Sequence, residues 1–276
     1  MKKSIAAAAL VLAAMAGPVH VMAQAPAAQP YRPAPGAKDV RATVYNWQWY
    51  MGMLRGPQER ELVATLEHQA TGTVMVGNQA CTASAYRVSN NYQVPGSRIQ
   101  YTCKLANGQE RKAIEVVSGR FSWDEDVMGA EIIPGVGKAT AQPALLNERL
   151  IRLWSGPQGA PKAAAMAGDK ATVAWAGNKA TVTYPIPGVA GAVAKATLND
   201  MFMAERIEVR QGGTVTEFTY SDFKDWNNEL NKIDAIYAGK LTEKKGGRVV
   251  RDLTTTVTET GNVYVVMPVP KSVSGG

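Results

Sequence analysis

Short pairs of glycine and asparagine recur along this sequence at the spacing of turns in an antiparallel β-sheet. A two-residue type I′ turn needs a positive φ at both central positions, which glycine and asparagine accept with least strain. β-Branched or alternating segments flank the pairs, as the strands of hairpins do. The pairs are Gly77-Asn78, Asn107-Gly108, Gly177-Asn178, Gly212-Gly213, Gly246-Gly247 and Gly261-Asn262. The chain is therefore expected to consist mainly of antiparallel hairpins.

The clearest strand is Arg98–Leu105, in which apolar and polar residues alternate. Ile99, Tyr101, Cys103 and Leu105 fall on one face, and Arg98, Gln100, Thr102 and Lys104 fall on the other. A period of two is typical of a strand that is buried on one side. Further strands are predicted at Thr71–Val76, Ser84–Val94, Lys112–Val117 and Arg120–Trp123. Residues 71–123 are thus expected to form an antiparallel meander.

A second run of strands follows in the C-terminal half. It comprises Ala171–Trp175, Ala180–Tyr184, Val193–Leu198, Arg206–Arg210, Thr214–Tyr220, Lys232–Ala238, Arg248–Glu259 and Val263–Met267. Between the two runs, Pro143–Trp154 and Pro161–Met166 are expected to be helices. No second linker and no internal repeat separates the two β halves, so a single domain is expected.

The first ordered element is predicted to be a helix over Asp39–Leu54. Val40, Val44, Trp47, Met51 and Leu54 recur at spacings of three and four, which places them on one helix face. The second half of this helix is apolar on almost every side. Such a helix is either part of the core or a cover over a hydrophobic cavity. The sequence favours a helix of the core, and a cover over a hydrophobic cavity remains the alternative.

The N-terminus has the pattern of an export signal. Lys2 and Lys3 precede an uncharged stretch of 12 residues, Ile5–Ala16, which is too short to cross a bilayer as a helix. We expect cleavage after Ala23 and a periplasmic or secreted protein. Removal of residues 1–23 lowers the net charge from +7 to +5.

Four regions are expected in all. Residues 1–23 are the signal peptide, and residues 24–37 are a flexible tether rich in proline and alanine. Residues 38–270 are the single β-rich domain, and residues 271–276 are a disordered tail.

Two cysteines, Cys81 and Cys103, occur in the chain. In an oxidising compartment a pair of this kind is most simply one disulfide, because the spacing is not that of a C-x-x-C redox motif. Closing a loop of 22 residues would stabilise the fold by roughly 3 kcal/mol on the chain-entropy model.

The sequence offers little for catalysis or for a metal. His68 is the one histidine after Ala23, and it lies in no recognised catalytic or zinc motif. Neither a phosphate-binding loop nor a dinucleotide fingerprint is present, so no cofactor is expected. The basic residues are dispersed, which argues against nucleic acid as a partner. Carboxylates for a hydrolase remain an open alternative, at Asp124, Glu125, Asp126, Asp222 and Asp225.

Two segments carry a family resemblance. Gly119-Arg120-Phe121-Ser122-Trp123, after the meander, resembles the G-x-F-x-W segment of periplasmic outer-membrane lipoprotein carriers, the LolA/LolB-like superfamily. The segments 206–209, 217–223 and 253–270 are similar to that family's last strands and its closing proline-containing segment. The resemblance implies an unclosed antiparallel half-barrel with helices over its concave face. It also implies non-covalent carriage of lipid chains, without catalysis.

The sequence therefore predicts a mainly β, half-barrel-like protein that holds an apolar or lipid-like ligand. An envelope protein or the outer-membrane surface is a further candidate partner. The residues expected to line the cavity are Trp47, Met51, Leu54, Tyr101, Phe121, Trp123, Trp154, Phe218 and Tyr220. The leading alternative is a cell-envelope structural or interaction module without a small ligand, and a carboxylate-based hydrolase comes after it.

Overall fold

The computed structural model describes residues 30–226, 236–260 and 265–275. The predicted signal peptide lies outside this range. So do the turn at Gly261-Asn262 and most of the predicted strand Lys232–Ala238.

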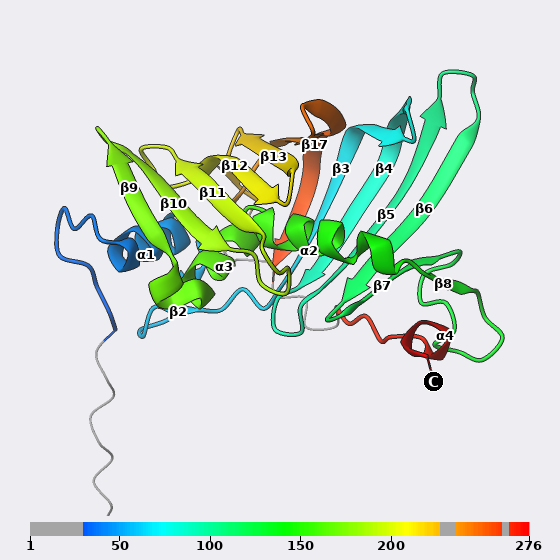
Figure 1. Cartoon of the computed structure of the whole chain (residues 1–276), viewed down its shortest axis with the longest axis horizontal. Coiled ribbons are helices and arrows are strands. Elements are labelled where there is room, and N and C mark those ends of the chain that lie inside the picture. Colours follow the sequence, from blue (N-terminus) through cyan, green and yellow to red (C-terminus); the bar gives the residue numbers. More distant parts are fainter. Residues whose placement is uncertain (1–29, 227–235, 261–264, 276) are drawn as a thin grey trace, which may run out of the picture.

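One large sheet of 13 strands dominates the structure, and every neighbouring pair of its strands is antiparallel (Figure 1). The strand order is β8-β7-β6-β5-β4-β3-β17-β16-β13-β12-β11-β10-β9. Strands β8 and β9 form the two edges, so the sheet is open. This confirms the predicted open, mainly antiparallel β fold with few helices.

The first part of the sheet is the expected meander. It consists of β3 (Thr65–Val76), β4 (Gln79–Asn91), β5 (Gly96–Leu105), β6 (Glu110–Ser118), β7 (Phe121–Glu125) and β8 (Ala139–Ala141). Gly77-Asn78 and Asn107-Gly108 make the turns that join β3 to β4 and β5 to β6. The disulfide between Cys81 and Cys103 links β4 to β5, as predicted.

The second part continues the same sheet. It consists of β9 (Thr172–Ala176), β10 (Lys179–Pro185), β11 (Val193–Leu198), β12 (Ala204–Gln211), β13 (Thr214–Ser221), β16 (Lys240–Lys245) and β17 (Arg248–Thr260). Strand β17 pairs with β16 on one side and with β3 on the other. The C-terminal strand therefore joins the two β halves, which are far apart in the sequence.

Three helices lie against one face of the sheet, called here the inner face (Figure 1). They are α1 (Val40–Tyr50), α2 (Leu146–Ser155) and α3 (Gly159–Ala167). Their apolar side chains share one core cluster with strands β10 to β13. Short 3₁₀ turns at Pro143–Leu145 and Gly168–Lys170 flank the helical pair α2 and α3.

Helix α1 begins where the sequence predicts and ends earlier. The side chain of Asp39 caps its N-terminus by accepting from the backbone N–H of Ala42. Gly52, with φ of +66°, follows the last turn, and Leu54 lies in a two-stranded ribbon of β1 (Leu54–Arg55) and β2 (Arg60–Glu61). The second half of α1 is apolar on almost every side, and part of this character lies at the surface. There the ring of Trp49 stacks on the ring of Tyr45.

Some predictions differ from the structure. Strand β16 was not predicted, and Val265–Met267, expected to be a strand, has no regular structure. The expected disordered tail contains a short helix, α4 (Lys271–Ser274), that packs against β7 and β8. A small pair, β14 (Lys224–Asp225) and β15 (Ile236–Tyr237), completes the described elements.

Candidate ligand cavity

A small cavity of about 50 Å³ lies between α2 and the inner face of the sheet. Residues from β4, β5, β13, β16 and β17 surround it, together with residues of α2. Its apolar wall is formed by Val88, Ile99, Leu153, Phe218 and Leu253. These side chains face inward because they alternate along their strands with residues that point to the opposite face.

A charged cluster that the sequence did not predict borders the same cavity. Arg152 of α2 donates through Nε to both carboxylate oxygens of Glu243, at 3.1 and 3.0 Å. Arg251 donates to Glu243 at 2.8 Å and to Glu115 at 3.1 Å. Burial acts against the charge of Arg152, but the carboxylates of Glu243, Glu115 and Glu148 together raise its pKa. The arginine therefore stays charged beneath the helix.

Further polar contacts hold α2 on the sheet. Arg149, which is buried, donates to the carbonyl oxygens of Val116 and Trp123 and to the carboxylate of Asp124. At the other side of the helix, Lys245 donates to Glu148. Charged hydrogen bonds thus fix the helix position at several points.

Some polar atoms around the cavity have no partner within the described residues. They are Nδ1 of His68, Oδ1 of Asn90 and Oγ of Ser155. The other ring nitrogen of His68 lies 3.4 Å from the hydroxyl of Tyr237. Burial lowers the pKa of His68 to about 3, so the ring is neutral at physiological pH. A buried polar atom without a hydrogen bond costs about 1–3 kcal/mol, which makes these positions receptive to a polar group.

The structure brings a minority of the predicted cavity residues to this cavity. Phe218 and Tyr220 line it, and the Tyr220 hydroxyl donates to the carbonyl oxygen of Ser155 at 2.7 Å. Trp47, Met51 and Trp154 lie instead in the neighbouring core between the helices and the sheet.

The remaining predicted residues lie elsewhere. Leu54 is half-buried in the ribbon of β1 and β2. Tyr101 stacks on Tyr86 beside the disulfide-linked cluster of β4 and β5. Phe121 and Trp123 belong to a separate cluster with Val265 and Met267 of the C-terminal segment.

The carboxylates considered for hydrolysis are held by other groups. Asp124 pairs with Arg149, while Glu125 accepts from Nε1 of Trp123 and pairs with Arg98. Asp124 and Glu125 are adjacent in a strand and so point to opposite faces. Asp222 is exposed and lies 3.3 Å from Lys240. Glu125 and Asp126 both line a hollow on the opposite face of the sheet, where Asp126 accepts from the backbone N–H of Lys138.

Two kinds of feature are absent from the described residues. No group of three or more histidine, cysteine or acidic residues is placed to hold a metal ion. Among these residues, no helix has the length and apolar character needed to span a bilayer.

Comparisons with known proteins complete the description. No family model matches this sequence, and no curated protein matches it. Among solved structures, the chain resembles an outer membrane lipoprotein-sorting protein domain from Vibrio parahaemolyticus, with a TM-score of 0.45 and 10% identity over 81% of this chain and 94% of the other. It also resembles a LolA superfamily protein from Nitrosomonas europaea, with a TM-score of 0.45 and 12% identity over 82% and 96%.

Proposed function

We propose that this chain is an exported, periplasmic carrier that holds a lipid-like ligand between α2 and the inner face of the sheet, without catalysing a reaction. The observation that carries the proposal is the cavity under α2. Its wall is apolar, and the unpartnered polar atoms of His68 and Asn90 belong to residues of the same lining. An amphiphile with an apolar chain and a polar head matches both features.

The size of the cavity determines how a ligand can enter it. A volume of about 50 Å³ is too small for an acyl chain, since ligand pockets usually measure about 300–1,000 Å³. Helix α2 therefore has to move away from the sheet when a ligand enters. The contact between Glu148 of this helix and Lys245 lies near the surface and can be exchanged for water at modest cost. The buried pair of Arg152 and Glu243 also has to open, and it is the larger barrier to this movement. In this proposal α2 is the cover, and α1 is part of the core.

Native mass spectrometry of residues 24–276 purified from the periplasm tests the proposal directly. A bound lipid that survives purification and is lost on denaturation is the expected result. Displacement of a fluorescent fatty-acid probe measures the same site in solution. A clean ligand-free mass together with no probe binding would overturn the carrier proposal.

A cavity-filling variant makes the test specific. Leu241→Trp places a larger side chain at the half-buried wall of the cavity and is expected to weaken probe binding at least fivefold. The matched control is Val76→Trp, a half-buried position beside the disulfide-linked cluster and outside the cavity. Equal probe binding by both variants would place the ligand elsewhere.

One observation favours a second function, that of an envelope interaction module. The loop between β7 and β8 exposes five large apolar side chains, Val127, Met128, Ile132, Ile133 and Val136. Exposed apolar groups concentrated in one loop are typical of interaction surfaces. A concentration-dependent mass or a captured partner, without extractable lipid, would support this alternative over the carrier.

A further inference from the structure

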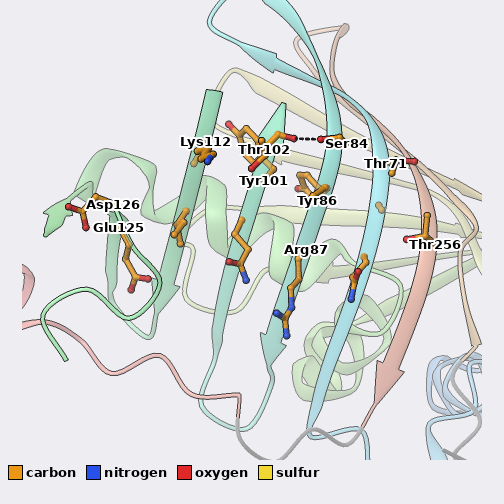
Figure 2. Close-up of a pocket in the computed structure, with 16 residues that line it drawn as sticks. Thr71, Ser84, Tyr86, Arg87, Tyr101, Thr102, Lys112, Glu125, Asp126 and Thr256 are labelled. Carbon is orange, nitrogen blue, oxygen red and sulfur yellow. Dashed lines mark hydrogen bonds between the residues drawn. The ribbon is translucent and has the colours of Figure 1, made fainter. Parts of the chain in front are cut away.

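A much larger hollow, of about 740 Å³, lies on the other face of the sheet, called here the outer face. Figure 2 shows its lining side chains, which come from neighbouring strands and include Lys112, Thr102, Arg87 and Thr71. Arg87 alternates along β4 with Tyr86 and Val88, which face the inner cavity. The outer hollow therefore opens on the face opposite the proposed lipid site, and Tyr86 borders both.

Aligned breaks in the strand register coincide with this hollow. The pairing shifts between Ala70 and Gly72 in β3, between Ala83 and Ala85 in β4, and between Thr255 and Val257 in β17. The extra residues at the breaks are Ser84 in β4 and Thr256 in β17, and both line the hollow. Thr71 of β3, which lies between these two strands, lines it too. Bulges bend strands and are frequent beside binding sites. One bulge in β4 and one in β17, on either side of β3, explain how the outer face of the sheet becomes concave here.

The floor of the hollow carries a straight row of side chains. Ile114 of β6 pairs with Gln100 of β5, which pairs with Arg87 of β4, which pairs with Gln69 of β3. Directly cross-strand partners repeat at the strand separation of about 4.8 Å. The row therefore offers hydrogen-bonding groups at a regular spacing along a line that crosses the strands.

Much of this hydrogen-bonding capacity is unused within the protein. Among the described residues, the side chains of Gln69, Thr71, Thr102 and Thr256 make no hydrogen bond. Gln100 approaches only the sulfur of Met128, at 3.9 Å. Arg87 is held by Glu67 at 2.7 Å, so its charge is largely balanced. The charged residues of the lining are Arg87, Lys112, Glu125 and Asp126, two of each sign, so the hollow presents amide and hydroxyl groups with little net charge.

We propose that the outer hollow binds an extended polysaccharide chain that lies across strands β6, β5, β4 and β3. A glycan presents hydroxyl groups on both sides, which match donors and acceptors such as Gln69, Gln100 and Thr102. The strand spacing is close to the length of one sugar ring in an extended chain. Each strand would therefore contact about one sugar.

Other ligand classes fit the hollow less well. A peptide strand binds by adding to a sheet edge, whereas the backbone groups at this floor already pair with neighbouring strands. Nucleic acid needs several unbalanced cations, and Arg87 is paired with Glu67. An acyl chain has no use for the amides and hydroxyls of this surface.

The test is isothermal titration calorimetry of the full mature chain with two defined probes, the hexasaccharides of β-1,4-linked N-acetylglucosamine and of β-1,4-linked glucose. We expect at least one probe to bind with micromolar to millimolar affinity. The double variant Gln69→Ala with Gln100→Ala is expected to weaken that binding at least fivefold. Gln211→Ala, an amide at the end of β12 outside the hollow, is the matched control and is expected to bind as the wild type does.

Each outcome decides the proposal. No heat with either probe at millimolar concentration overturns it, and so does equal binding by the double variant and the wild type. Unchanged circular dichroism and thermal unfolding of the double variant exclude misfolding as the cause of a loss. The fatty-acid probe should bind the double variant normally, since that probe reports on the inner cavity. Failure of the glycan site and failure of the carrier function are therefore distinguishable.

Discussion

The guanidinium group of Arg152 on α2 lies against the carboxylate of Glu243 on β16, and Nε contacts both carboxylate oxygens. Glu243 is only 2% exposed, and Arg251 is its one other cationic partner in the described structure. The contact joins the proposed cover helix to the strand beneath it. Its strength therefore bears on both folding and ligand entry.

We predict that Arg152→Met lowers the free energy of unfolding by about 3 kcal/mol. The reason is that the attraction to Arg152 offsets much of the cost of burying the charge of Glu243, and this attraction is lost in the variant. Urea denaturation measures the change. The matched control is Arg206→Met, which removes an arginine that pairs with Glu208 and Glu217 at the surface. The control substitution should lower the free energy of unfolding by less than about 1 kcal/mol. Equal losses of stability in the two variants would contradict the buried-pair explanation.

The stability of the protein is predicted to fall as the pH decreases below about 6.5. An unfolded histidine has a pKa of about 6.5, whereas burial lowers the pKa of His68 to about 3 in the folded protein. The folded state favours the neutral ring, so this contribution is complete above pH 6.5 and is lost as the pH falls toward 3. Within that window the free energy of unfolding changes by up to about 1.4 kcal/mol per pH unit.

His68→Gln tests this prediction, since glutamine keeps a polar side chain and does not titrate. Urea denaturation of both proteins at pH 7, 6, 5 and 4 measures how the free energy of unfolding of each changes with pH. The wild type should lose stability more steeply than the variant between pH 6 and pH 4. Parallel curves would show that His68 is accessible to water and protonates freely in the folded state.

The sequence predicted the sheet well where alternation and turn residues coincide. Strand β11 has the predicted bounds, Val193–Leu198, and the turn at Asn107-Gly108 joins the predicted strands. Strand β16, Lys240–Lys245, was missed because the most buried of its inward-facing residues is the charged Glu243, which packs against arginines. Binary patterning detects apolar burial and cannot detect a buried ion pair.

The site residues were predicted less well for a related reason. The alternation in β7 shows that Phe121 and Trp123 share a face. It does not show which face of the sheet the helices cover. In the structure the C-terminal segment, through Met267, packs over these rings instead. Arg152 was equally hard to find, since an arginine four residues after Glu148 is typical of an exposed helix surface.

Helix α1 is predicted to contribute to stability and not to ligand binding. Trp47 is fully buried in the core cluster and does not line the cavity. Trp47→Ala should therefore lower the free energy of unfolding by about 3–5 kcal/mol while leaving fatty-acid probe affinity within twofold, measured where the variant is folded. Phe218→Ala is the comparison, because Phe218 is equally buried and does line the cavity. It should reduce probe affinity, and a larger affinity loss for Trp47→Ala would make α1 part of the site.

Strand β3, which lies between the two bulged strands that shape the outer hollow, depends on a glycine. Gly72 in β3 has a φ of +145°, and a Cβ atom there would lie 2.2 Å from the backbone oxygen of Asp252 in the paired strand. The backbone of the neighbouring strand cannot move aside in the way that a flexible side chain can. Gly72→Ala should therefore destabilise the protein by at least about 2 kcal/mol.

The matched control for this glycine is Gly213→Ala in the turn between β12 and β13, where an added Cβ meets nothing within 4 Å. That change should be neutral or slightly stabilising, because alanine reduces the freedom of the unfolded chain. Thermal unfolding of both variants checks the prediction. If Gly72→Ala is as stable as Gly213→Ala, strands β3 and β17 can separate at the bulge, and the outer hollow is not a fixed feature of the fold.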